Sequence, residues 1–108
     1  MMLINRKRGE IAADLGGKER ALCLTLGALA ELEAHFGAAD LLALTQRFST
    51  GHLSADDLLT IIHAGLKGAG HTFTREEVAE MQAEGGAAGY ARIVSELLQV
   101  TFGADATE

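Results

Sequence analysis

The chain has 108 residues, of which 48% are hydrophobic and 22% charged, and these values are typical of one globular domain. Its formal net charge is −6, and the basic residues Arg6, Lys7 and Arg8 leave the remaining body more acidic still, which disfavours a nucleic-acid partner. Apolar stretches near the N-terminus are shorter than a membrane span, and residues 1–4 are too few for the apolar core of a signal peptide. We therefore expect a cytoplasmic protein with no membrane partner.

The first predicted element is a β-hairpin. Apolar side chains occupy every second position in residues 11–15 and again in 22–26, and Gly16-Gly17 lies between the two runs. A period of two on both sides of a Gly-Gly pair predicts a hairpin over residues 9–25. Because a lone hairpin is only marginally stable in water, its apolar face must pack on helices.

The apolar spacing changes to three and four residues after Thr25, which predicts a first helix that ends at Gly37. Asp40 is a favourable N-cap for a short second helix, and Ser54 with Asp57 has the spacing of a capping box that opens a third. Glycines at positions 65, 68 and 70 are expected to end the third helix. The apolar faces of these three helices are Leu26, Leu29, Leu32 and Phe36; Leu41, Leu44 and Phe48; and Ala55, Leu58, Leu59, Ile62 and Leu66.

Two more helices complete the chain. Thr74 and Glu77 form a second capping box, which predicts a short helix that carries Val78 and Met81 on its inner side and is broken at Gly85-Gly86. The last helix has the strongest pattern, with apolar residues at i, i+3, i+4, i+7 and i+8 from Tyr90, and Gly103 ends it.

These elements predict a mainly α (α+β) fold. A single domain over residues 1–108 is expected to hold an N-terminal β-hairpin (9–25) packed on a bundle of about five helices (26–103). Residues 1–8 and 104–108 are expected to be flexible, the former as a solvated basic arm.

The sequence carries no motif of an enzyme, a metal site or a cofactor site. The histidines at positions 35, 52, 63 and 71 lack the spacing that places two ligands on one helical face. Acidic residues such as Asp56 and Asp57 lie in the first turns of helices, where the helix dipole favours them. The glycine-rich segment 65–72 follows a helix and lacks the Lys-Ser/Thr pair of a phosphate-binding loop. The lone Cys23, flanked by leucines, is interpreted as a small apolar packing residue.

Interaction with a partner is the remaining interpretation. The apolar side of the final helix offers a surface for groove-type contact, and the hairpin offers open edges. The alternative interpretation, that both complete the core of the domain itself, stays open. The predicted partner-binding residues are Tyr90, Val94, Leu97, Leu98 and Phe102.

The chain resembles a family of small proteins encoded in the tail-gene cluster of gene transfer agents and related tailed phages of alphaproteobacteria. The resemblance begins at Arg8-Gly9-Glu10 and continues through Leu24-Thr-Leu-Gly-Ala-Leu-Ala-Glu-Leu-Glu33 and Phe36-Gly37. Further agreement lies in Leu53-Ser-Ala-Asp-Asp-Leu58, Ala64-Gly-Leu66, Gly89-Tyr90 to Leu97-Leu98 and Thr101-Phe-Gly103. Nearly the whole chain is covered.

Members of that family are described as tail assembly chaperones, and the family has also been labelled a tail tube protein. The resemblance implies a non-enzymatic factor that binds the tape measure protein, or other phage-tail proteins, while the tail assembles. Two alternatives stay open: a structural tail component that forms homo-oligomeric rings and is retained in the particle, and a small-molecule binding domain. The resemblance brings no catalytic residue and no cofactor.

Overall fold

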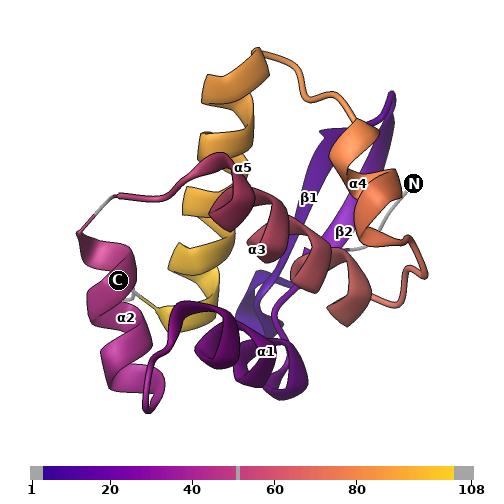
Figure 1. Ribbon diagram of the computed structural model, residues 1–108. Coiled ribbons are helices and arrows are strands. Elements are labelled where there is room, and N and C mark those ends of the chain that lie inside the picture. Colours follow the sequence, from indigo (N-terminus) through magenta and orange to yellow (C-terminus); the bar gives the residue numbers. More distant parts are fainter. Residues whose placement is uncertain (1–3, 51, 104–108) are drawn as a thin grey trace.

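The computed structural model describes residues 4–50 and 52–103. Within them, a two-stranded antiparallel sheet of β1 (Glu10–Leu15) and β2 (Lys18–Cys23) precedes the helices (Figure 1). The helices are α1 (Leu26–Phe36), α2 (Leu41–Ser49), α3 (Ala55–Gly68), α4 (Arg75–Glu80) and α5 (Gly86–Phe102). The predicted fold, an N-terminal hairpin with five helices, is therefore confirmed.

The hairpin has the tight turn that its sequence indicates. Gly16 and Gly17 both have positive φ, at +67° and +85°, as the two central residues of a two-residue hairpin turn of type I′ require. The register pairs Leu15 with Lys18 and Glu10 with Cys23. Because side chains alternate across a strand, Ile11, Ala13 and Leu15 of β1 all face the core, as predicted.

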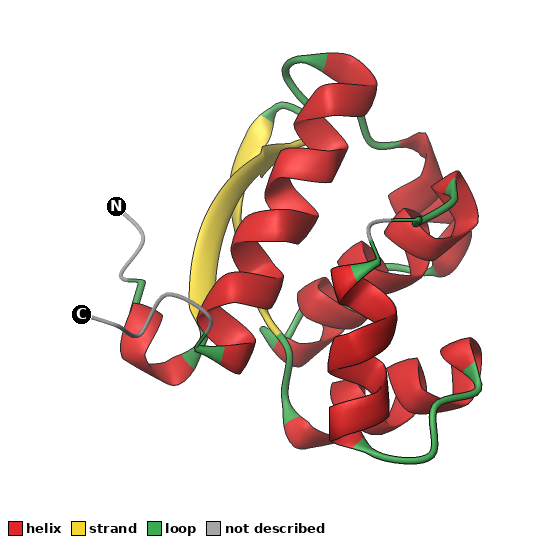
Figure 2. Ribbon diagram, turned by 90° about the vertical axis from the view of Figure 1, so that its left-hand side faces the viewer, coloured by secondary structure: helices red, strands yellow, loops and turns green. Residues whose placement is uncertain are grey.

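The core lies between the inner face of the hairpin and the helices. α3 packs on β2 and α5 packs on β1, and α1 packs on α3 (Figure 1). Figure 2 shows α5 beside the hairpin from another side. α2 packs chiefly on α1, at the side of the molecule away from the hairpin. The largest fully buried side chains are Ile11, Leu15, Leu22, Leu32, Leu44, Ile61, Leu66, Val94 and Leu97.

Two of the three glycines expected to end α3 also serve close packing. α3 continues to Gly68, and Gly65 lies buried inside it. A Cβ atom at Gly68 would lie 2.0 Å from the Cys23 carbonyl oxygen, and one at Gly65 would lie 2.8 Å from the Leu97 Cδ2 atom. Their lack of a side chain thus lets α3 approach β2, and the prediction that Gly65 stops the helix is wrong.

The fourth helix is shorter than predicted. α4 ends at Glu80, and Met81 is extended rather than helical. The segment after it pairs with the hairpin, where Gly16 N donates to Gln82 O at 2.9 Å and Ala83 forms an isolated bridge with Leu15. These hydrogen bonds to the hairpin take the place of the helical hydrogen bonds that one more turn of α4 would make. Met81 still packs against the core, but it lies after the helix and not within it.

The first residue of α1 does not follow the expected pattern of buried apolar residues. Leu26, the first residue of α1, is 77% exposed, because helical side chains lean toward the N-terminus and the first one projects past the helix end.

Arg6–Arg8 form one turn of 3-10 helix capped by Asn5, and Arg6 pairs with Glu96 of α5 at 2.7 Å. These three basic residues are exposed, as expected of a solvated arm, but the ion pair of Arg6 attaches the segment to α5. Flexibility of residues 1–8 stays a prediction, and residues 104–108 lie outside the described residues.

Candidate functional site

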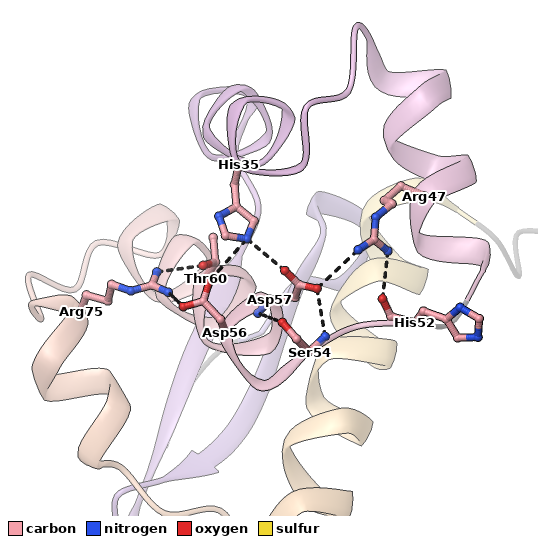
Figure 3. Close-up of polar contacts among 8 residues, drawn as sticks. All are labelled: His35, Arg47, His52, Ser54, Asp56, Asp57, Thr60 and Arg75. Atoms are coloured by element: carbon pink, nitrogen blue, oxygen red, sulfur yellow. Dashed lines mark hydrogen bonds and ion pairs between the residues drawn. The ribbon is translucent and has the colours of Figure 1, made fainter.

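A cluster of polar side chains, which we call the α3 clasp, joins four helices around the N-terminus of α3 (Figure 3). His35 of α1 has its Nε2 atom 3.1 Å from Asp57 Oδ1, and Arg47 of α2 pairs with Asp57 Oδ2 at 3.4 Å. Arg75 of α4 pairs with Asp56 and donates to Thr60 Oγ1. Sequence reasoning did not bring these residues together, because they are up to 40 positions apart.

The clasp begins with the predicted capping box. Ser54 Oγ accepts from Asp57 N at 3.0 Å, and Asp57 Oδ2 accepts from Ser54 N at 2.9 Å. Burial raises the pKa of the Asp57 carboxyl, but hydrogen bonds from Ser54 and His35 and the charge of Arg47 lower it more, so the pKa lies below its ordinary value. The carboxylate is thus held in its charged form.

His35, Asp56 and Asp57 have potential metal-ligand atoms within 4.8 Å of one another. Both carboxylates, however, already pair with arginines, and a divalent cation would have to displace Arg47 and Arg75 or add its charge beside theirs. Each of these contacts joins a different helix to α3. We therefore interpret the clasp as a structural ion-pair network that fixes the helix packing.

Two other reactive side chains also have structural partners. The Cys23 thiol is half-buried and donates to Arg8 O at 3.7 Å, and burial, with the charge of Glu10, raises its pKa above the ordinary value. A raised pKa keeps the thiol protonated and weakly nucleophilic. His63 has its Nε2 atom 3.0 Å from Phe73 O, which ties α3 to the loop before α4.

The five predicted partner-binding residues lie along one side of α5 but differ in exposure. Val94 and Leu97 are 1% and 0% exposed and belong to the core of the domain. Tyr90 is half-buried, and its hydroxyl donates to Met81 O. Leu98 and Phe102 are half-buried at the α2 end of α5. Partner binding by this set stays a prediction, and within it Tyr90, Leu98 and Phe102 keep accessible surface beside an open pocket.

Three adjoining pockets follow α5 over most of its length, and together we call them the α5 groove. The first, of about 250 Å³, lies between α3, α4 and the start of α5. The second and third lie between α2 and α5; the second shares Leu58 with the first, and Phe48 and Leu98 with the third. The lining side chains are Leu15, Thr45, Phe48, Ser49, Leu53, Ala55, Leu58, Leu59, Ile62, Val78, Ala79, Met81, Ala87, Tyr90, Ala91, Val94, Ser95, Leu98, Gln99 and Phe102.

The α5 groove is apolar and elongated. From Ala87 to Phe102 its wall on α5 covers about four helical turns, or ~22 Å at the rise of an α-helix. In the first pocket the Tyr90 hydroxyl is the only polar side-chain group, and it is already bonded to a carbonyl. At the other end, Phe48 packs beside Phe102 with ring centroids 6.1 Å apart. Among the described residues, the polar side chains of the groove lie at its α2 end, where Thr45, Ser49, Ser95 and Gln99 line the third pocket.

Sequence reasoning found the α5 wall of the groove and missed the facing wall. Phe48, Leu53 and Leu58 come from α2, the following loop and α3, and the periodicity of the sequence does not bring them to α5. One signal was present: α3 carries apolar residues on more than one face, including the adjacent pairs Leu58-Leu59 and Ile61-Ile62. One packing partner cannot cover so wide an apolar surface, so part of the α3 surface is left for another contact.

The fold and the groove define a small α+β domain with an elongated, mainly apolar groove along its last helix. A family model described as "Phage tail tube protein, GTA-gp10" matches residues 8–104, which is nearly the whole chain. The chain therefore belongs to this family of phage and gene transfer agent tail proteins. No curated protein and no solved structure matches the chain. No helix within residues 4–50 and 52–103 is both long and apolar enough to span a membrane.

Proposed function

We propose that the protein is a tail assembly chaperone that binds an apolar helical segment of the tape measure protein in the α5 groove. Membership in a phage tail family supports a role among tail proteins, and the open apolar groove is the observation that carries the finer proposal. A helix bound there would lie beside α5 and bury its apolar face against Tyr90, Leu98 and Phe102.

The length and chemistry of the groove support a helical occupant. An amphipathic helix presents apolar residues at i, i+3, i+4 and i+7, and a groove of ~22 Å takes about four such turns. Its walls offer aromatic and aliphatic side chains, with Thr45, Ser49 and Ser95 near the α2 end. Helix-in-groove binding uses this combination of an apolar floor and a few polar groups.

The charge of the chain supports the chaperone over a structural subunit. Residues 9–108 carry fifteen acidic and six basic residues, so copies of the domain repel one another. A ring or tube subunit needs two complementary surfaces of its own, one for each neighbour. Among the described residues the large exposed apolar side chains are Leu26, Leu41 and Leu42, which is little surface for such interfaces. A tube or tail-completion role, which the family description also accommodates, remains the second candidate.

A small-molecule binding role is less well supported by the geometry. Specific small-molecule sites combine an apolar pocket with several polar groups that orient the ligand. Of the described residues that line the first pocket, Tyr90 alone has a polar side-chain group, and its hydroxyl already donates a hydrogen bond to Met81 O. The groove thus fits an apolar chain segment better than a polar metabolite.

Co-expression with the tape measure protein encoded nearby tests the proposal. The complex and the protein alone are compared by size-exclusion chromatography with light scattering. We expect co-elution, a more soluble tape measure protein and a monomeric or small free species. Rings formed by the free protein, or its presence in stoichiometric amounts in purified particles without tape measure binding, would refute the chaperone role and favour the structural one.

A further inference from the structure

Residues 72–84, which we call the α4 strap, lie along the outside of α3 and bury little surface of their own (Figure 1). Val78 is the one buried residue of the strap, and Phe73, Met81 and Ala83 are half-buried against the core. The helix within it, α4, has six residues, and a helix of that length is not stable in water by itself. The strap is therefore ordered only while it is docked on the domain.

Polar contacts with three other elements hold the strap in place. They join Gly16 N of the hairpin to Gln82 O, the Tyr90 hydroxyl of α5 to Met81 O, His63 of α3 to Phe73 O, and Arg75 to Asp56 of α3. The Asp56 side chain is 64% exposed, so solvent screens its ion pair. Each of these groups has a hydrogen bond to water as its alternative when the strap moves away.

Glycines flank the strap on both sides. Gly70 precedes it with φ of +101°, and Gly85 and Gly86 follow it with φ of +91° and +61°. A Cβ atom built at Gly70 or Gly86 would have no atom of another part of the chain within 4 Å. The backbone at both ends thus has the conformational freedom and the open space that a hinge requires.

The strap also forms one wall of the first pocket of the α5 groove. Val78, Ala79 and Met81 line this pocket from the strap, and Leu59 and Ile62 line it from α3. Ile62 is 3% exposed while the strap is docked. Movement of the strap away from α3 would therefore open the pocket and expose apolar side chains of α3.

We infer that the α4 strap is a lid on the α5 groove, which opens as one unit about its flanking glycines while the hairpin, α3 and α5 stay folded. The closed form is the stable one in the free chain, because opening exposes Leu59 and Ile62 to water. An apolar occupant that covers these side chains shifts the population toward the open form. The inference goes beyond the proposed function, because the opening is a property of the free chain whatever fills the groove.

Amide hydrogen exchange of the full chain, followed by NMR in increasing but sub-denaturing urea, tests this inference. The Val78 amide bonds to Thr74 O inside the strap, whereas the Gly16 amide lies on the hairpin and only its acceptor, Gln82 O, belongs to the strap. Both amides should show the same protection factor, at least about 30-fold below that of Ile62 inside α3. Their exchange should also quicken with urea, because the opening exposes apolar surface.

Two hydroxyl deletions on α5 form a matched pair. Tyr90→Phe removes the hydrogen bond to Met81 O and should speed the exchange of Val78 and Gly16 about three- to tenfold. Thr101→Val removes a hydrogen bond to Leu97 O, within α5 itself, and should leave both exchange rates unchanged, because that bond persists when the strap opens.

Four results would each overturn the inference. They are protection of Val78 equal to that of Ile62, unequal protection of Val78 and Gly16, exchange of these two amides that does not respond to urea, and equal acceleration by Tyr90→Phe and Thr101→Val. The first would mean that the strap opens only when the whole domain unfolds, and the second and third would mean that its residues fray separately. Failure of the tape measure protein to co-elute would remove the proposed function and leave the exchange result standing.

Discussion

Gly68 is the position where adding one methyl group should perturb the fold most. In the interior of a helix, Gly→Ala normally stabilises by about 1 kcal/mol, because alanine loses less conformational freedom on folding. Here the new Cβ atom would lie 2.0 Å from the Cys23 carbonyl oxygen, whereas ordinary contacts begin near 3.4 Å. α3 and the end of β2 would have to separate by more than about 1 Å, and overpacking of this kind typically costs 1–3 kcal/mol or more.

We therefore expect Gly68→Ala to lower the free energy of unfolding by about 2 kcal/mol, which corresponds to a fall in Tm of about 10 °C for a domain of this size. Two glycines provide matched controls. Gly65→Ala would meet the buried Leu97 and Leu22 side chains, whose ends can shift more easily than a backbone carbonyl, and should cost about 1 kcal/mol. Gly27→Ala would meet only Thr25 Oγ1 at 3.9 Å and should stabilise by several tenths of a kcal/mol.

Urea unfolding followed by circular dichroism gives all three values in one series. The expected order of stability is Gly27→Ala, then the parent chain, then Gly65→Ala and finally Gly68→Ala. A Gly68→Ala variant as stable as the parent chain would refute the close approach of α3 to β2, and with it the packing that positions α5 and its groove.

Three further predictions concern the charged and reactive side chains. The pKa of Asp57 in the folded chain lies below its ordinary value, so the charged carboxylate stabilises the fold at neutral pH. This stabilisation is lost as the pH falls from the ordinary pKa through the pKa of the folded state. Asp57→Asn should therefore make the free energy of unfolding depend less on pH in that acidic range. The raised pKa of Cys23 predicts slower alkylation by iodoacetamide at pH 8 in the folded chain than in urea, and equal rates would contradict it. Arg6→Ala removes an exposed ion pair with Glu96 and should cost under about 1 kcal/mol, less still at high salt; a larger loss would mean that the 3-10 turn is integral to the core.

Local chemistry accounts for the part of the fold that the sequence predicts. Ser54 and Thr74 begin their helices because their hydroxyls cap backbone amides, and Gly37 and Gly103 end theirs in the left-handed conformation. The last turn of the predicted fourth helix fails for a non-local reason. Gln82 and Ala83 find hydrogen-bond partners on the hairpin, which is more than 60 positions away in the sequence.

The candidate site was predictable only in part for the same reason. Leu97 and Leu98 are adjacent and chemically identical, yet the former is fully buried and the latter lines the groove. Periodicity places both on the apolar side of α5 and does not reveal how closely a neighbouring helix approaches. That spacing is fixed by tertiary contacts, such as the packing of α2 on α1 and the contacts of the α3 clasp.

Leu98→Ser tests whether the α5 groove binds the tape measure protein. Leu42 is 68% exposed on α2 outside the groove, so Leu42→Ser is a control that also removes an accessible leucine. The dissociation constant of the tape measure complex is measured for the parent chain and both variants, after circular dichroism shows that each is folded. We expect about tenfold weaker binding for Leu98→Ser, from the ~1.5 kcal/mol of apolar burial lost, and no change for Leu42→Ser. Unchanged affinity of Leu98→Ser, or an equal loss in Leu42→Ser, would show that the tape measure protein does not bind in the groove.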